Sequence, residues 1–464
     1  ADMAAFLNGY DMTGSHLTYQ QVFHRETSLT RWAGGLANYG ASFSYFAYLW
    51  EQAGGNGDGT LEPEQEYDEA GGDLLIKLIF AEPADGMEGV QNAIDDYNAQ
   101  TGSTLRSAEE LFKDWVVTMY LDDEDSSLWD LENFDLGAAS NNWTIDIANS
   151  VFWDDRGSYI GALPEARSSR LKNRPDTTAL PFGVSYEKFR NPGPEVRIDF
   201  DGEATTRVAP LDGDTHWWGG YASQSDHILA VDTEVSGGET VTFTNWHFIE
   251  EGWDYGFVEA LVDGEWKTLP VTLEGTDTVV SSDENPHDNN EEGNGITGTS
   301  GGEYFVDDPE YLTYQVTLPA GAEDLRFRYS TDAAYLDTGW FIDQVWIDGA
   351  EAAVSPEGDG WTDTNGTQYN NWAVQVISRC DLTPGVDTVG EVTDGAGNYV
   401  YRFDSDESGD ITVESLSTLC ANGKQGDFVL AISNLPTGDL TVLDADYEYA
   451  VTNTGARSSG RGTR

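Results

Sequence analysis

The chain up to about residue 130 carries apolar residues at helical spacing. Between residues 36 and 52 they recur three or four positions apart, for example at Tyr39, Phe43 and Trp50, before two glycines interrupt the pattern. Such spacing places apolar side chains on one face of a helix, and glycine commonly ends it. An amphipathic helix is therefore predicted over residues 36–52.

Further helices are predicted in the same region. Apolar spacing continues over residues 72–80 and 86–97, which Pro83 separates, and resumes after Ser107. Ser107 has Glu110 three residues later, which is the pattern of a capping box at a helix start. We expect residues 1–140 to form a small helical subdomain.

From about residue 143 the spacing changes to alternation between apolar and polar positions. Short alternating segments bounded by Gly, Asn, Asp and Pro are typical of strands in β-sandwiches. The clearest segments are 196–200, 239–243, 255–259, 325–329, 340–345, 372–376, 428–432 and 447–451.

The order of these strands suggests two nested domains. Strand 196–200 finds candidate partners only far along the chain, at 372–377, 428–435 and 447–451. The predicted fold is α+β: the helical subdomain, then a jelly-roll-like β-sandwich from residues 175–210 plus 362–455, with a second sandwich of residues 211–361 inserted in it. Three consecutive domains are the alternative arrangement. Residues 456–464, rich in Gly, Ser and Arg, are predicted to be a flexible tail.

The net charge of the chain excludes one class of function and indicates the conditions in which the protein is stable. The 464 residues include 83 acidic and 23 basic ones, for a net charge of -60. A chain this acidic cannot neutralise a phosphate backbone, so nucleic-acid binding is excluded. Aromatic residues make up 12%, unlike a disordered acidic chain. Self-repulsion on this scale is relieved when salt screens it, which predicts a salt-adapted protein that loses stability below about 0.5 M salt.

Several features point outside the cell. Cys380 and Cys420 lie in one segment and form either a single disulfide or two buried thiols. Asn142 and Asn365 begin Asn-x-Thr glycosylation sequons. No apolar run reaches the roughly 18 residues needed to cross a bilayer. The sequence opens on Ala-Asp-Met without a signal peptide, so residue 1 is expected to be internal to a longer precursor that is extracellular or attached to the cell surface.

No catalytic centre can be assembled from the sequence. The chain has no His-Glu-x-x-His zinc helix, no Gly-x-Ser-x-Gly elbow and no phosphate loop. Paired carboxylates for glycoside hydrolysis cannot be singled out among so many acids. No catalytic residue is therefore assigned in this chain.

Three ordered motifs between about residues 210 and 350 carry a resemblance. They read Phe248-Ile-Glu-Glu-Gly-Trp-Asp-Tyr-Gly-Phe-Val258, Gly293-Asn-Gly-Ile-Thr-Gly298, and Leu325 to Asp332 followed by Gly339-Trp-Phe-Ile-Asp-Gln-Val-Trp-Ile347. This stretch is similar to the β-sandwich module of immune inhibitor A-like secreted metallopeptidases.

The helical region carries a second resemblance. Segments 1–7, 28–32, 38–42 and 45–49, with Lys113-Asp-Trp-Val-Val117, resemble the part of gluzincin-type zinc metallopeptidases that follows the third zinc ligand. The resemblance implies zinc and a general-base Glu that together activate water. None of those ligands is in this sequence, so the chain alone is expected to be inactive.

Two functions are compatible with these observations. The first is the C-terminal part of an extracellular, salt-adapted zinc metallopeptidase that acts on a protein or peptide substrate and associates with its own cleaved N-terminal portion. The alternative is a non-catalytic cell-surface, filament-forming or adhesion protein on the same scaffold. In the alternative, aromatic side chains could stack on glycans, although aromatics in strands usually belong to the core. The candidates are Trp217, Trp218, Tyr221, Trp246, Trp253 and Trp340.

Acidic residues within the aromatic strands of the module suggest a structural calcium site. A buried carboxylate needs a cation or hydrogen-bond donors, and calcium prefers oxygen ligands. Glu250, Asp254 and Asp343 are the preferred ligands. In the alternative interpretation, acids such as Asp332 and Asp343 pair with Arg326 or Arg328, or cap turns.

Overall fold

The computed structural model describes residues 2–454, with internal gaps. Its fold is α+β and rich in antiparallel sheet, as predicted. The residues outside the description are 1, 8–15, 18, 21–25, 33–34, 56–70, 85, 122–125, 127, 130, 132–143, 147–150, 154–158, 162–164, 168–173, 209–215, 334, 359, 386–390, 394–396, 406, 421, 439 and 455–464. The predicted tail and the Asn142 sequon position therefore lie outside the described residues.

The predicted helices are confirmed. Among the described residues the helices are α1 (Asp2–Leu7), α3 (Leu36–Gln52), α4 (Gly71–Ala81), α5 (Gly86–Thr101) and α6 (Ala108–Leu121). The Ser107 hydroxyl accepts a hydrogen bond from the Glu110 N–H, so it caps α6 as predicted. None of the described helices is long and apolar enough to span a membrane.

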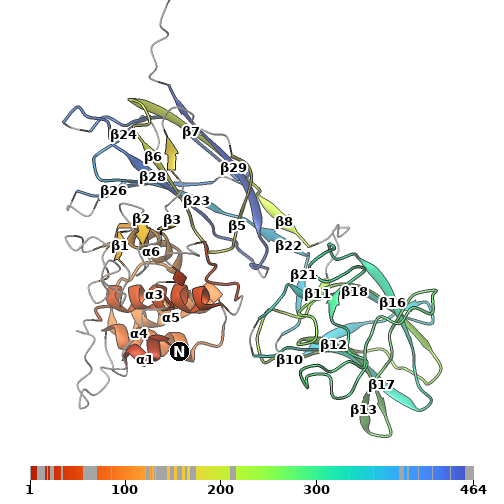
Figure 1. The fold of residues 1–464 in the computed structure, drawn as a ribbon. Coiled ribbons are helices and arrows are strands. Elements are labelled where there is room, and N and C mark those ends of the chain that lie inside the picture. The colour runs from red at the N-terminus through yellow and green to blue at the C-terminus, as the bar shows by residue number, and fades with distance from the viewer. Residues whose placement is uncertain are drawn as a thin grey trace, which may run out of the picture.

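Helix α3 is buried almost all round, which its single apolar stripe did not predict. Besides Phe43 and Trp50, small or hydroxyl-bearing side chains such as Ala41, Ser44 and Tyr48 are buried. Such a helix is surrounded by packed elements instead of covering a surface. Figure 1 shows α3 in the middle of the helical part, where it contacts α4, α1 and α6.

Two sheets enclose a core close to the helices. The sheet that faces the helices contains β25 (Glu391–Thr393), β26 (Tyr399–Asp404), β23 (Trp372–Ser378), β28 (Phe428–Asn434), β6 (Ser185–Arg190) and β4 (Glu165–Arg167). The opposite sheet contains β24 (Thr383–Gly385), β27 (Asp410–Ser417), β7 (Glu195–Gly202), β29 (Ala445–Asn453) and β5 (Arg174–Ala179). Residues from both sides of the intervening 216–364 stretch thus pair in the same sheets.

The 216–364 stretch forms two further sheets around a separate core, and it is called the module below. One sheet contains β14 (Thr272–Leu273), β16 (Leu312–Thr317), β11 (Thr240–Ile249), β18 (Gly339–Ile347), β9 (His216–Trp218) and β21 (Thr362–Thr364), with β15 (Gly298–Thr299) and β19 (Ala350–Glu351) at its margins. The other contains β13 (Glu265–Thr268), β12 (Tyr255–Val262), β17 (Ala322–Ser330), β10 (Asp226–Val231) and β20 (Val354–Glu357). All eight segments that alternation singled out are strands.

A narrow connection joins the module to the other sheets. Strands β8 (Thr205–Arg207) and β22 (Thr367–Tyr369) pair as a two-stranded ribbon between them (Figure 1). A small apolar cluster that includes Trp218, Phe341 and Leu440 packs across this boundary. A three-stranded sheet of β1 (Thr144–Asp146), β2 (Val151–Trp153) and β3 (Tyr159–Gly161) completes the described strands.

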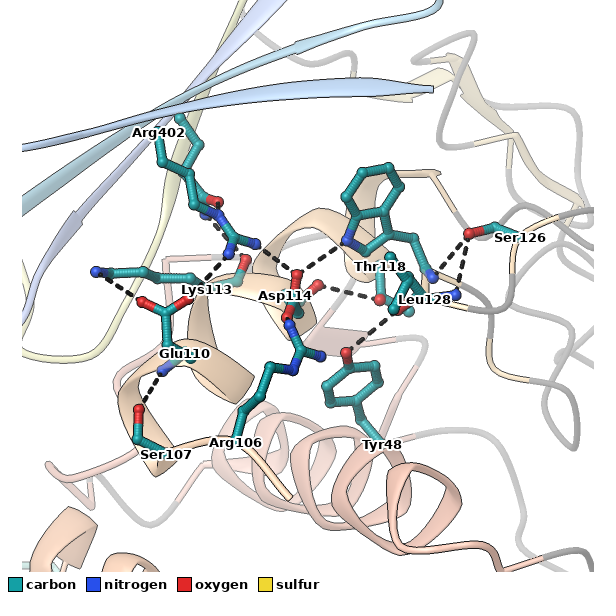
Figure 2. A network of polar contacts seen from close by, with 12 residues as sticks. Tyr48, Arg106, Ser107, Glu110, Lys113, Asp114, Thr118, Ser126, Leu128 and Arg402 are labelled. Atoms are coloured by element: carbon teal, nitrogen blue, oxygen red, sulfur yellow. Dashed lines mark hydrogen bonds and ion pairs between the residues drawn. The ribbon is translucent and has the colours of Figure 1, made fainter. Parts of the chain in front are cut away.

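A buried polar network fixes α6 to the sheet that faces it. Figure 2 shows Arg402 of β26 reaching toward Asp114 on α6, which Arg106 approaches from the other side. The Asp114 side chain is fully buried and also accepts a hydrogen bond from the Trp129 indole. Each charge is therefore matched, as a buried ion pair requires.

Candidate metal centre

Three acidic side chains meet at one end of the module. Glu250 and Asp254 lie in the turn between β11 and β12, and Asp332 follows β17. One carboxylate oxygen from each lies within 4.8 Å of the others. Within the described part of the chain, this is the only group of three or more His, Cys, Asp or Glu side chains so arranged. It is called the acid site below.

The turn that carries two of these acids is held by main-chain bonds. The N–H groups of Trp253 and Asp254 donate to the carbonyl oxygen of Glu250, at 3.3 and 3.1 Å. Gly252 has a φ of 79°, which favours glycine. The Thr297 hydroxyl donates to the Glu250 carbonyl oxygen and accepts from the Gly252 N–H. The two carboxylates are thus presented by a closed turn.

The third acid is placed by strand register. Tyr255 of β12 pairs with Ser330 of β17, so Asp254 and Asp332 lie just beyond the paired ends of adjacent strands. The Asp332 N–H donates to Oδ1 of Asp254 at 2.8 Å. The carbonyl oxygen of Asp332 accepts from the Gln224 N–H. These bonds bring the 332 main chain against the 250–254 turn.

Two carboxylate oxygens of the acid site are buried without a hydrogen-bond donor. They are Oε2 of Glu250 and Oδ2 of Asp254, and Asp254 is 0% exposed. Leaving a buried carboxylate oxygen unsatisfied costs more free energy than a hydrogen bond returns. The arrangement therefore calls for a cation or for protons at these atoms.

Burial raises the pKa of two acids of the site, Asp254 and Glu250. Desolvation raises the pKa of Asp254 to about 8, with a contribution from the charge of Glu250, although the Asp332 N–H opposes the shift. Desolvation, followed by the charges of Asp332 and Asp337, raises the pKa of Glu250 to about 7. A cation at the acid site would compete with these protons and remove the repulsion between the carboxylates.

The ligand set favours a hard cation. Three carboxylates offer only oxygen atoms, which suit Ca²⁺ or Mg²⁺, whereas protein zinc sites are usually built from Cys and His. Ca²⁺ accepts six to eight oxygens in flexible geometry, while Mg²⁺ demands a near-ideal octahedron. Glu250, Asp254 and Asp332 would hold the cation. Because they come from two separate loops, a flexible coordination sphere fits them better.

The structure brings together two of the three predicted ligands. Asp343 lies apart, on β18, where its Oδ1 is 3.4 Å from Nδ1 of His216. Asp332 occupies the third position instead. Arg326 and Arg328, the alternative partners for Asp332 and Asp343, both bind Glu259 through their Nε atoms at 2.6 and 2.8 Å. The register of the 255–259 and 325–329 strands was the signal that could have identified Asp332.

The structure describes the two cysteines and the second sequon asparagine, Asn365. Cys380 and Cys420 form a disulfide bond, with Cα atoms 5.6 Å apart. Asn365 is exposed in the turn between β21 and β22, and its amide donates to the Tyr369 hydroxyl.

The proposed aromatic platform is mostly core. Trp218, Trp246 and Trp340 are buried, which confirms the core interpretation for them. Trp253 is 38% exposed, and its ring stacks on that of His287 with centroids 3.5 Å apart. No broad face of adjacent exposed rings is formed by these residues.

No protein-family model and no curated protein matches the sequence. Function must therefore be argued from side-chain geometry and from the motifs quoted above.

Proposed function

We propose that this chain is the non-catalytic scaffold of an extracellular, salt-adapted zinc metallopeptidase of the immune inhibitor A-like kind, and that its module binds a structural Ca²⁺. The acid site supports the Ca²⁺ part of this proposal, because all three of its side chains are carboxylates. A zinc centre that activates water usually has histidine ligands and a separate general base. In the proposal, that centre belongs to the catalytic half whose motifs this sequence lacks.

An incompletely covered helix supports an associated partner portion. Helix α4 is strongly apolar, yet Leu74, Leu78 and Ile79 are only partly buried, and Phe80 is 62% exposed. An apolar stripe of this kind is normally covered by another element. A cleaved N-terminal portion that stays bound would cover it.

Strand pairing supports the nested arrangement of domains. Strand β7 pairs with β27 and β29, and β6 pairs with β28, across the whole length of the module. We therefore propose a sandwich of residues 175–210 plus 362–455, with a second domain of residues 211–361, which contains most of the module, inserted in it.

Calcium has a structural role in this proposal. It would tie the 250–254 turn to the start of the 331–337 segment, which otherwise meet through the bond from the Asp332 N–H to Asp254. A cation that binds only the folded state stabilises that state by about 2.7 kcal/mol when the free cation concentration is a hundred times the dissociation constant.

The test compares two aspartates in the same module. The melting temperature is measured at molar salt, with Ca²⁺ or with a chelator, for the wild-type chain, Asp254→Asn and Asp343→Asn. Ca²⁺ should raise the melting temperature of the wild type and Asp343→Asn but not that of Asp254→Asn. If the chelator leaves the wild-type melting temperature unchanged, the cation site is rejected.

The catalytic part of the proposal has its own test. Reading the coding sequence upstream of residue 1 should reveal His-Glu-x-x-His followed by Asn-Glu-Gly. Degenerate letters at those positions would favour the surface or filament alternative. The glycan-binding form of that alternative has less support, because Trp218, Trp246 and Trp340 belong to the core.

A further inference from the structure

A pocket lies where the end of α6 meets one end of the sheet that faces the helices. It has a volume of about 610 Å³, and Tyr120 and Leu121 of α6 line it on the helical side. The disulfide bond between Cys380 and Cys420 also lines it. Ligand pockets usually measure about 300–1,000 Å³. The size therefore suits a small organic ligand or the end of a peptide.

The charge of this pocket is opposite to that of the chain. The whole sequence has 83 acidic and 23 basic residues. Among the 16 described residues that line the pocket, the basic ones are Lys188, Arg379 and Lys424, and the one acidic residue is Asp427. A net positive lining is not expected from so acidic a composition, and it favours an anionic ligand. It is called the basic pocket below.

Strand register places Lys188 on the face of the sheet toward the helices. Lys188 of β6 pairs with Val429 of β28, which pairs in turn with Ile377 of β23. Val429 and Ile377 pack in the same core as the helices. Tyr186, two residues before Lys188, donates a hydrogen bond to a carbonyl oxygen of α6. Since residues two apart share one face of a strand, Lys188 faces the end of α6 as well.

The disulfide bond positions the other two cations. The Cys420 N–H donates to the carbonyl oxygen of Lys424 at 2.9 Å, and the Gly423 N–H donates to that of Cys420 at 2.8 Å, which closes a tight turn. The bond to Cys380 ties this turn to the residue that follows Arg379. Lys424 is exposed, and it forms no ion pair with the described residues. Arg379 and Lys424 are thus held at the disulfide side of the pocket.

The remaining lining is largely apolar. Five apolar or aromatic residues that line the pocket are buried, and they are Tyr120, Leu121, Ile377, Phe428 and Val429. A ligand that fills the pocket therefore places an apolar group beside its negative charge.

Salt also favours a ligand with an apolar group. At molar salt the Debye length is about 3 Å, so only direct contacts between charges contribute, and chloride competes for them. Burial of apolar surface does not depend on charge and remains favourable. A simple inorganic anion gains only the weakened ionic contacts, whereas an amphipathic carboxylate gains both.

The end of α6 decides the orientation of such a ligand. The C-terminal end of a helix carries a partial negative charge, which repels an anion near Tyr120 and Leu121. The carboxylate is therefore expected beside Arg379 and Lys424, with the apolar group toward α6. A guanidinium can bind a carboxylate through two parallel hydrogen bonds.

Amide side chains favour a peptide over other organic acids. An amide group both donates and accepts hydrogen bonds, so it can pair with the N–H and C=O groups of a peptide main chain. Three residues that line the pocket carry amides, and they are Asn191, Asn422 and Gln425.

We propose that the basic pocket binds the C-terminal carboxylate of a peptide whose last residue is apolar. The carboxylate pairs with Arg379 and Lys424, and the last side chain packs on Tyr120 and Leu121. The pocket is built from α6 and the sheet that faces it, whereas the acid site belongs to the module. This inference therefore goes beyond the proposed Ca²⁺ site and does not depend on it.

The experiment measures fluorescence anisotropy of dansyl-Gly-Ala-Phe, with a free carboxylate, on the full chain at molar NaCl in the presence of a chelator. The same peptide with a C-terminal amide should bind about tenfold more weakly, because it loses the charge-assisted contacts. Dansyl-Gly-Ala-Gly should also bind about tenfold more weakly, because it lacks the apolar side chain.

Three variants locate the binding site. Lys424→Gln and Arg379→Gln should each weaken binding of the free acid about threefold and leave binding of the amide unchanged. Lys267→Gln is the matched control, because Lys267 is an exposed lysine on β13 of the module, and it should change neither. Lys424 is exposed in a turn, so its variant should keep the wild-type melting curve and the test remains decisive if Arg379→Gln does not fold.

Several results would overturn the proposal. Equal binding of acid and amide would show that the cations are not used, and displacement of the peptide by sulfate as readily as by unlabelled peptide would indicate a simple anion site. Unchanged binding in both pocket variants would place the peptide elsewhere, and no binding to the wild type would exclude the site. Because the chelator removes Ca²⁺, failure of the acid site leaves this test intact, and failure here leaves the acid site intact.

Discussion

Two regions of this acidic chain bury carboxylates, and they differ in whether positive groups and hydrogen-bond donors surround them. Around Asp114, two arginines and an indole N–H surround a fully buried carboxylate (Figure 2). At the acid site, Glu250 and Asp254 each bury an oxygen that receives no hydrogen bond. One region supplies its own positive charge, whereas the acid site leaves two buried carboxylate oxygens without a hydrogen-bond donor.

The difference shows what each region can do. A buried carboxylate that is held by arginines of the same chain has its partners built into the fold, so it can fix two parts of the chain to each other. A carboxylate group without bases changes state when a cation or a proton arrives. With 23 basic residues for 83 acidic ones, a cluster without a base is a place where the solution can control the fold.

The largest expected effect comes from salt. At a net charge of -60, lowering the salt below about 0.5 M should unfold the whole chain, since repulsion is no longer screened. Circular dichroism during dialysis into dilute buffer measures this. An unchanged melting curve would show that local pairing, as at Asp114, is sufficient for the entire fold.

Asp114→Asn tests the self-compensated region, in which Arg106 and Arg402 balance the buried carboxylate of Asp114. It leaves Arg402, whose side chain is 8% exposed, without its buried counter-ion, and it weakens the hold on Arg106. Removing one partner of a buried pair costs about 3–5 kcal/mol. Denaturant unfolding at molar salt should show this loss equally with and without Ca²⁺. Dependence on Ca²⁺ would contradict the separation of the two regions.

Asp254→Asn, in contrast to Asp114→Asn, should change the free energy of unfolding mainly when Ca²⁺ is present. Without Ca²⁺, burial raises the pKa of Asp254 to about 8, so near neutral pH the neutral amide replaces a largely protonated carboxyl group and the free energy of unfolding should stay nearly level. With saturating Ca²⁺ it loses a ligand, so the variant should lack the wild type's gain of about 2–3 kcal/mol. The measurement is the same unfolding experiment, and Asp343→Asn is its control. A uniform loss in both conditions would mean that Asp254 acts only in packing.

The sequence predicts the helices and strands well, and it singles out two of the three acids that the structure brings together. Alternation identified the strands because each one buries one face, and the 36–52 helix was found from its apolar stripe. The sequence does not indicate that Asp332, and not Asp343, lies beside Glu250 and Asp254, because the spacing of apolar residues does not tell which loops meet. The Asp114 network was not predicted, since Arg402 lies 288 residues further along the chain and only the tertiary fold brings it near.

His247 is a third kind of buried titratable group, because burial favours its neutral form. It is fully buried on β11, and desolvation lowers its pKa to about 3. Its folded pKa lies below the unfolded value of about 6.5, so the unfolded state binds more protons between these values and stability falls as pH drops below 6.5. At pH 5 the loss is about 2 kcal/mol.

His247→Gln tests this effect in chelator. The variant should have a flatter dependence of unfolding free energy on pH between 6.5 and 5 than the wild type, because glutamine does not titrate. Equal slopes for the two proteins would show that His247 does not control the acid response.

The smallest expected effect lies at the edge of the self-compensated region. Asp404 is 45% exposed, and its Oδ1 is 2.9 Å from Nζ of Lys113. Lys113 is nearly buried but has Glu109 and Glu110 as further partners, at 2.7 and 3.5 Å. Asp404→Asn should therefore cost less than about 1 kcal/mol in denaturant unfolding, since exposed pairs contribute little and molar salt weakens them further. A loss as large as that of Asp114→Asn would mean that the compensation is a collective property of the whole network, and the contrast with the acid site would then depend on the number of partners and not on burial.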